Sequence, residues 1–202
     1  MCSDNKVVFG RRRLVIATTV AGGVGVIAGA VPFVASMLPS GRAMANTAPV
    51  EADIGLLTPG RMMTVEWHGK PVWIVYRTRE MLDSLAGLND RLADPYSKRR
   101  QSEFAAPADI RPETRSIRPE LLVVIGLCPH LGCSPISVFS KGAASGIDPG
   151  WQGGFLCACH GSTFDLAGRV FKNKLASDNL PIPPHVYLSD TRILIGENGK
   201  RA

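Results

Sequence analysis

One long apolar run dominates the N-terminal fifth of the chain. From Leu14 to Gly41 the sequence contains 28 consecutive residues without a charge. A membrane-spanning helix needs about 20 apolar residues at a rise of about 1.5 Å per residue. The pattern therefore predicts a transmembrane anchor over residues 14–38, preceded by a cytoplasmic N-terminus over residues 1–13.

The residues that flank this run predict its orientation and its link to the rest of the chain. Lys6 and Arg11–Arg13 precede it, and positive charge tends to stay cytoplasmic, so the residues after the run are expected on the far side of the membrane. Residues 39–50 are rich in small residues, contain Pro and Gly, and predict a flexible tether. The alternative is a cleaved signal, with Ala43-Met-Ala45 as the cleavage site. The length of the run favours a retained anchor.

Short β-rich runs characterise residues 51–202. The His68-Gly69-Lys70-Pro71 segment between the first two runs predicts a hairpin, and Thr78 before Arg-Glu-Met-Leu predicts a capped short helix. Residues 88–119 are charged, contain four prolines and predict a surface insertion. We therefore expect an all-β, antiparallel head domain over residues 51–202. The predicted strands are Met62–Trp67, Val72–Arg77, Leu121–Leu127, Ile136–Phe139, Gly154–Cys157, Val170–Lys172, Val186–Leu188 and Arg192–Ile195.

Composition and charge agree with one globular domain plus an appendage. The chain has 202 residues, of which 45% are hydrophobic and 20% charged, and its net charge is +6. Residues 1–43 hold five Lys and Arg against one acid, whereas the remainder holds 18 against 16. The basic character is therefore mostly N-terminal, and we expect no nucleic-acid partner.

Two short boxes contain four of the five cysteines. They are Cys128-Pro-His130-Leu-Gly-Cys133 and Cys157-Ala-Cys159-His160-Gly-Ser162, and each supplies a Cys-His pair plus one further cysteine. Two thiolates and two imidazoles form a four-ligand metal site. Zinc would accept that set, but zinc sites usually pair Cys with Cys and His with His, and zinc leaves two thiols unused. A pure disulfide framework would leave the two histidines unexplained. Cys2, the fifth cysteine, is interpreted as an incidental thiol.

Both boxes closely resemble those of the Rieske iron–sulfur proteins of quinol–cytochrome c reductases, and the resemblance covers essentially the whole chain. It implies one [2Fe–2S] cluster of Rieske type, held in a subdomain over about residues 126–180. Cys128 and Cys157 would bind the buried iron, and His130 and His160 the outer iron. Cys133 and Cys159 would form a disulfide between the two loops, which implies an oxidising compartment. Residues 11–15, Arg-Arg-Arg-Leu-Val, likewise resemble a twin-arginine export signal, which carries folded proteins.

The same resemblance implies a function and partners. The chain would be a subunit of a proton-translocating bc complex in the bacterial inner membrane, with its head in the periplasm. It would accept an electron from quinol at cytochrome b and pass it to a cytochrome c-type haem subunit, with release of protons. His160 would be the catalytic contact to quinol, and Leu131 would shield the cluster and pack on the partner.

Further residues beside the ligands are expected to tune the cluster. Ser162 would donate a hydrogen bond to a bridging sulfide, and Gly161 lies between it and His160. Phe164 stands where many high-potential members have tyrosine. Lys174-Leu-Ala-Ser177 replaces a Gly-Pro-Ala-Pro loop over the cluster.

Two other classes of protein are weighed against this interpretation. Rieske ferredoxins and oxygenase components have a similar site but generally lack the disulfide cysteines and the anchor. A zinc-stabilised periplasmic binding module would have no redox role. His68 and His185, outside the boxes, are interpreted as solvent-facing or structural.

Overall fold

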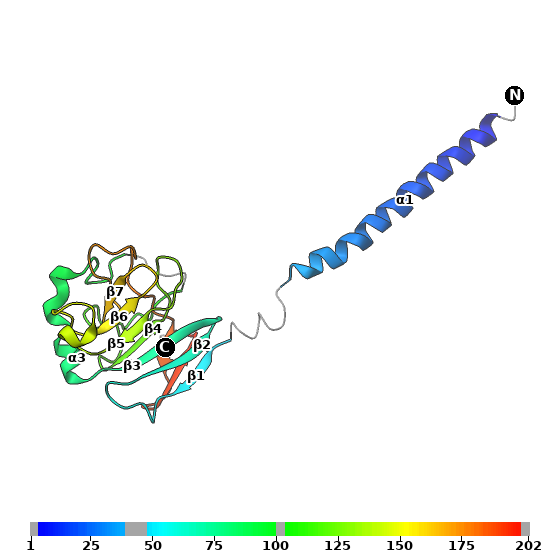
Figure 1. Ribbon diagram of the computed structural model, residues 1–202. Coiled ribbons are helices and arrows are strands. Elements are labelled where there is room, and N and C mark those ends of the chain that lie inside the picture. The colour runs from blue at the N-terminus through cyan, green and yellow to red at the C-terminus, as the bar shows by residue number, and fades with distance from the viewer. Residues whose placement is uncertain (1–3, 39–47, 100–103, 199–202) are drawn as a thin grey trace. The chain divides into compact units, whose positions relative to one another are not determined.

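The computed structural model describes residues 4–38, 48–99 and 104–198 (Figure 1). The chain divides into two units, Met1–Ala45 and Asn46–Ala202. Most of the predicted tether lies outside the described residues, and so does Cys2.

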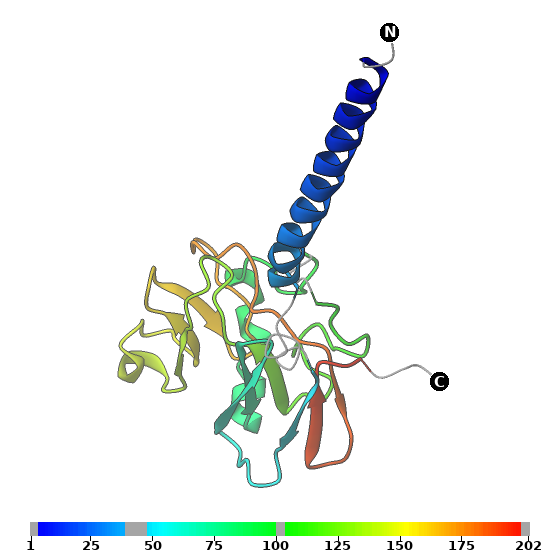
Figure 2. The ribbon, with the colours of Figure 1, turned by 90° about the vertical axis from the view of Figure 1, so that its right-hand side faces the viewer.

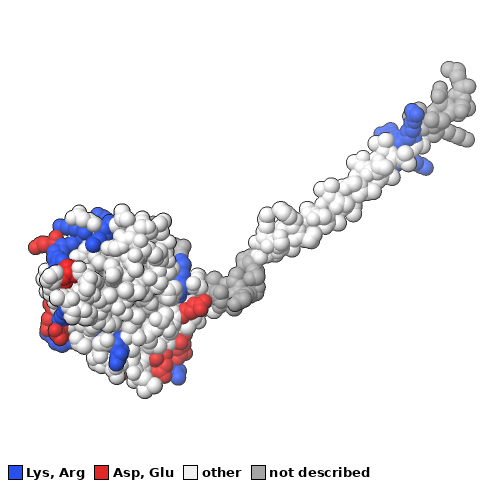
Figure 3. All heavy atoms as spheres, in the orientation of Figure 1, with Lys and Arg blue, Asp and Glu red and all other residues white. Residues whose placement is uncertain are grey.

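The first unit contains one long helix, α1 (Asp4–Ser36). Its Phe9–Ser36 portion has a mean hydropathy of 2.1 and is long and apolar enough to cross a membrane. Figure 3 shows basic side chains near its N-terminal end and an uncharged surface along the rest. The helix begins before the predicted residue 14 because the arginines that precede the apolar run are themselves good helix formers.

The second unit is built from antiparallel strands, which confirms the predicted all-β class. The described residues form three three-stranded sheets. In Figures 1 and 2 the β8–β9 hairpin lies beside β1, although the two are far apart in sequence. The first sheet contains β1 (Val50–Asp53), β9 (Arg192–Ile195) and β8 (His185–Tyr187) in that order; the second contains β2 (Met62–Trp67), β3 (Lys70–Tyr76) and β4 (Leu121–Ile125); the third contains β5 (Ile136–Val138), β6 (Gly154–Cys157) and β7 (Ser162–Asp165).

Strands β3 and β4 of the second sheet are buried on both faces. Along β3, Trp73 and Val75 belong to one apolar cluster, while Val72 and Ile74 belong to another, as the alternation of side chains in a strand requires. The first cluster also contains side chains of β6 and β7, and the second contains side chains of β1 and β9. The third sheet, in which β6 and β7 flank the second box, is therefore packed on a strand buried on both faces, and the first box connects the second sheet to the third.

Short helices fill the connections. Thr78 caps α3 (Arg79–Asp83) as predicted, because its side-chain oxygen accepts a hydrogen bond from the Met81 amide at 3.2 Å. The 3₁₀ helix η1 (Ala86–Arg91) follows in the same β3–β4 connection, and η2 (Gly142–Ser145) lies between β5 and β6.

Two local predictions are wrong. Residues 88–119 are not simply a surface insertion, because Leu92 and Arg115 are buried within it. Residues 170–172 form only isolated bridges, in which Val170 pairs with Phe164 and Phe171 with Leu92. The sequence analysis also missed strands β1 and β7.

Candidate metal centre

The two boxes form loops of matching backbone design. In the first, the Gly132 amide donates to the carbonyl of Cys128 at 2.9 Å; in the second, the Gly161 amide donates to the carbonyl of Cys157 at 2.9 Å. Both glycines have a left-handed backbone, with φ of 78° and 70°. That conformation favours glycine, which explains why a glycine stands four residues after the first cysteine of each box.

A disulfide joins these loops, between Cys133 and Cys159. The Cys128 amide also donates to the carbonyl of Cys133 at 2.8 Å, which closes the first loop on itself. The sulfurs of Cys133, Cys157 and Cys159 lie within 4.8 Å of one another. Since two of these three are oxidised to the disulfide, only Cys157 among them is available as a metal ligand.

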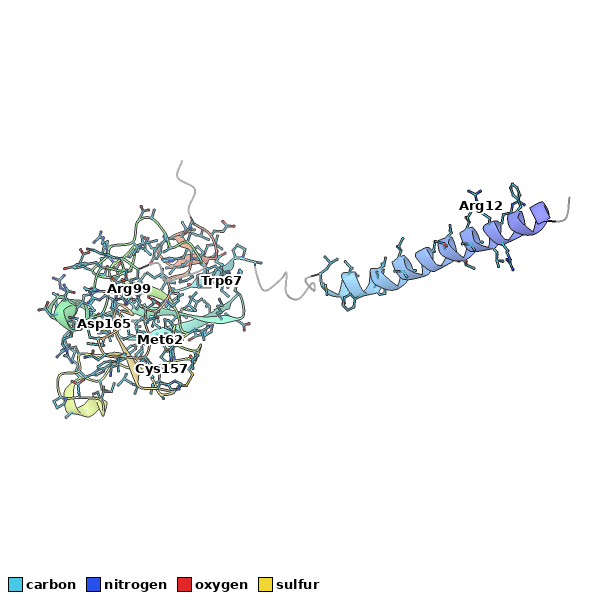
Figure 4. All side chains as sticks on the ribbon, turned by 90° about the horizontal axis from the view of Figure 1, so that it is seen from above. Arg12, Met62, Trp67, Arg99, Cys157 and Asp165 are labelled. Carbon is cyan, nitrogen blue, oxygen red and sulfur yellow. A yellow bond between two sulfur atoms is a disulfide. The ribbon has the colours of Figure 1, made fainter. Side chains whose placement is uncertain are left out.

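The remaining two box cysteines are free and buried. Cys128 is 2% exposed and Cys157 is 1% exposed, and their thiols are hydrogen-bonded to each other. The rings of His130 and His160 lie outside them, edge to face, with centroids 4.8 Å apart. Figure 4 marks Cys157, at the end of β6, among the packed side chains of the head. The two free thiols thus form one pair and the two imidazoles another, on the two loops that the disulfide joins, and the thiols are the more buried pair.

The environment of Cys128 opposes charge in the absence of a metal. Burial raises the pKa of the Cys128 thiol, and the hydrogen bond that this thiol donates to Cys157 adds to the rise, whereas backbone hydrogen bonds from His130 and Leu131 lower the pKa. A bound cation reverses the balance, because it deprotonates a coordinating thiol. The two amides then donate to a charged sulfur.

Ser162 and the segment around Ala176 meet beside the cysteines. Ser162 is fully buried, and its hydroxyl oxygen accepts a hydrogen bond from the Ala176 amide at 3.0 Å. An amide can only donate, so the hydroxyl proton of Ser162 remains available to another acceptor. Arg99 donates to the carbonyl of Ser177 at 2.8 Å. Hydrogen bonds therefore hold the segment in which prolines were expected.

The other predicted neighbours divide between core and surface. Phe164 is fully buried in the same apolar cluster as Cys128 and Cys157. Leu131, at the tip of the first loop, is 71% exposed. Leu175 is also exposed, at 61%.

A buried charge network behind β7 was not predicted. Asp165 and Arg169 form an ion pair of 2.7 Å that is almost wholly excluded from solvent. Arg77 and Arg115 donate to main-chain carbonyls of the adjoining turn, and burial lowers the pKa of each to about 10. The signal in the sequence was the Asp165-Leu-Ala-Gly168 turn, since the Asp side chain accepts from the amide of Ala167.

The donor set fits a Rieske cluster. Two buried thiols and two nearby imidazoles provide two ligands for each of two irons, and the disulfide accounts for the other two cysteines. A single zinc ion would be satisfied by the same four ligands, so the choice between them needs evidence from beyond the geometry.

Comparisons with known proteins decide between a [2Fe–2S] cluster and a zinc ion. Residues 110–184 match the model of the Rieske [2Fe-2S] domain, and residues 3–40 match the "Ubiquitinol-cytochrome C reductase Fe-S subunit TAT signal". The first match identifies the cofactor as a [2Fe–2S] cluster of Rieske type.

The relatives cover nearly the whole chain. The ubiquinol-cytochrome c reductase iron-sulfur subunit of Allochromatium vinosum is 54% identical over 188 residues, which span 93% of this chain and 88% of that one. The subunit of the same name from Bradyrhizobium diazoefficiens is 38% identical, covering 91% and 92%. That of Blastochloris viridis is 36% identical, covering 96% of both. This chain therefore belongs to the family of ubiquinol-cytochrome c reductase iron–sulfur subunits.

Proposed function

We propose that Cys128 and Cys157 hold the inner iron of the cluster and that His130 and His160 hold the outer one. The observation that carries this assignment is the burial gradient across the disulfide-linked loops, with free thiols inside and imidazoles outside. The cluster, when bound, accepts and releases one electron. The subdomain that holds it is taken as about residues 126–180.

In this proposal His160 is the catalytic contact to quinol. It is the more exposed of the two imidazoles, so its outer nitrogen can accept a hydrogen bond from a quinol hydroxyl. Exposed Leu131 lies beside the ligand loop, where it excludes water and packs on cytochrome b. The head then delivers the electron to a cytochrome c-type haem subunit, and oxidation of quinol releases protons.

The proposed placement follows from the first unit. Residues 1–13 are cytoplasmic, residues 14–38 anchor the chain in the inner membrane, and the tether at residues 39–50 leads to the head over residues 51–202 in the periplasm. The basic side chains before the apolar run support this orientation. The disulfide supports an oxidising compartment for the head.

The ligand assignment is tested by electron paramagnetic resonance of the reduced protein. His130→Cys and His160→Cys should each abolish the Rieske spectrum, whose average g lies below the free-electron value, because each removes one imidazole from the outer iron. His68→Gln is the matched control, since His68 lies in the β2–β3 turn. A native spectrum in either cysteine variant would overturn the assignment.

A further inference from the structure

A cavity of about 340 Å³ lies beside the third sheet, on the surface of the head. Residues that precede β6 form one wall, and residues that follow β7 form the other. None of the four proposed cluster ligands lines it. Its volume falls in the range of about 300–1,000 Å³ that is typical of small-molecule sites.

The floor of this cavity is aromatic. Trp151 is 2% exposed and Phe171 is 8% exposed, with ring centroids 5.8 Å apart and planes inclined by 39°. The indole nitrogen of Trp151 already donates to the carbonyl of Val138 at 3.1 Å. The tryptophan therefore offers a ligand apolar surface and no donor, and Ile147 extends that surface.

The rim is cationic. The Arg91 guanidinium lies 5.4 Å from the centre of the Phe171 ring, and Asp148 partly neutralises it at 3.9 Å. Lys172 and Lys174 are exposed and form no ion pair with any residue that the structure describes. The rim therefore carries two positive charges that Asp148 does not balance.

A threonine adds a polar group to the same wall. Thr163, on β7, lines the cavity and is 4% exposed. Its hydroxyl can donate or accept a hydrogen bond. A polar group of a ligand in the cavity would therefore have a hydroxyl in the wall as a partner.

We propose that this cavity binds a small organic anion. Its carboxylate or phosphate group would lie near Lys172, Lys174 and Arg91, and its flat apolar body would lie against Trp151 and Phe171. A short aromatic floor of two rings suits a small molecule rather than an extended acidic peptide, which would need a longer groove. Lys174 also begins the segment expected over the cluster, but none of the four proposed cluster ligands lines the cavity, so a failure of either proposal leaves the other standing.

Isothermal titration calorimetry on the full chain, in detergent and loaded with its cluster, tests the proposal. Phenyl phosphate is the probe, because it combines an anionic group with a flat ring. Inorganic phosphate and benzyl alcohol each carry one half of that chemistry, and both should bind at least about tenfold more weakly. The affinity for phenyl phosphate should also fall as salt is added, since the rim charges are exposed.

The double variant Lys172→Gln, Lys174→Gln should bind phenyl phosphate about tenfold more weakly. The control is Arg61→Gln, Arg79→Gln, which removes two positive charges from exposed residues that do not line the cavity and should leave the affinity unchanged. Three results would overturn the proposal. These are no binding of phenyl phosphate, equal affinity for inorganic phosphate, and the same loss of affinity in both double variants.

Discussion

Phe164 contributes packing to the metal centre but no hydrogen bond. Its ring is fully buried in the apolar cluster that contains both free thiols. A phenyl ring has no donor, whereas the amides of His130 and Leu131 donate to Cys128, and Ser162 follows the second box with its hydroxyl proton available. At the scale of single residues, the reduction potential of the cluster depends on individual hydrogen bonds to its ligands.

Phe164→Tyr should therefore raise the midpoint potential of the cluster. A hydroxyl that donates to a cysteine sulfur withdraws charge and stabilises the reduced state. A net hydrogen bond contributes about 0.5–1.5 kcal/mol, and about 1.4 kcal/mol corresponds to 59 mV for one electron. We expect a rise of roughly 20–65 mV in a redox titration followed by electron paramagnetic resonance.

Phe155→Tyr is the matched control for that variant. Phe155 is the cross-strand partner of Phe164, is equally buried, and stacks on Trp73 with centroids 5.1 Å apart. The control measures the effect of adding a hydroxyl to the same apolar cluster. If the midpoint of the Phe164→Tyr variant stays level with that of the control, with an intact line shape, the hydrogen-bond argument is refuted.

At the scale of elements, the disulfide converts two separate loops into one unit. Replacing Cys133 or Cys159 with Ser should leave the cluster able to bind, but should lower the stability of the loaded protein by about 2–4 kcal/mol. Thermal unfolding, monitored through the visible absorbance of the cluster, measures the loss. The bridge itself would be disproved if both thiols of the native, loaded protein reacted fully with an alkylating reagent.

The start of the first loop depends on close packing against β3. A Cβ at Gly126 would lie 2.2 Å from an atom of the Trp73 ring. Gly126→Ala should therefore displace the indole and destabilise the head by about 1–3 kcal/mol, as overpacking of a core does. Urea unfolding measures this, with Gly87→Ala as the control because its Cβ would meet no atom within 4 Å. Equal stability of the two variants would contradict the packing argument.

The elements that the sequence predicted are those with a clear apolar period. β2, β6 and β9 match their predicted ends, since their runs are bounded by turn residues. β7 was missed because Ser162-Thr-Phe-Asp165 has one apolar residue, although all four are buried. Its polar side chains are accommodated by partners outside the strand: Asp165 pairs with Arg169, and the Ser162 hydroxyl accepts a hydrogen bond from the amide of Ala176.

The metal centre was more predictable than the fold around it. Ligand types and spacings are written directly in the two boxes, and the predicted disulfide between them is present, while the assignment of the four ligands stays a prediction. The prediction that residues 88–119 form a surface insertion failed because burial there depends on contacts with residues far away in the sequence. Arg115 is charged, but it is 2% exposed because it donates to the carbonyls of Ala167 and Leu180.

For the molecule as a whole, stability should depend on pH through His185. Burial lowers the pKa of His185 below its usual value of 6.5, and Nε2 is buried without a partner among the described residues. Below about pH 6.5, His185 therefore binds a proton in the unfolded chain but stays neutral in the folded head until a lower pH. Stability from this residue is present at neutral pH and is lost as the pH falls.

The measurement compares urea unfolding of the loaded wild type and His185→Gln at about pH 7.5 and about pH 5.5. The wild type should lose more stability between these values, by up to about 1.4 kcal/mol per pH unit. Protonation of other groups affects both proteins alike, so the difference reports His185. Identical losses would show that His185 is not the responsible group.

The first unit determines whether the mature molecule is anchored. Phe9–Ser36 contains 28 residues, and at about 1.5 Å per residue this exceeds the roughly 30 Å hydrocarbon core of a bilayer. The hydrophobic region of a cleaved signal is only about 7–15 residues long. We therefore expect the intact mass of the protein extracted from membranes to include the residues before Asn46.

Val24→Arg should release the chain from the membrane, because a central arginine costs about 2.5–3.5 kcal/mol, whereas Val24→Leu should not. A mature chain that begins at Asn46 would instead show cleavage after Ala45 and would refute the anchor.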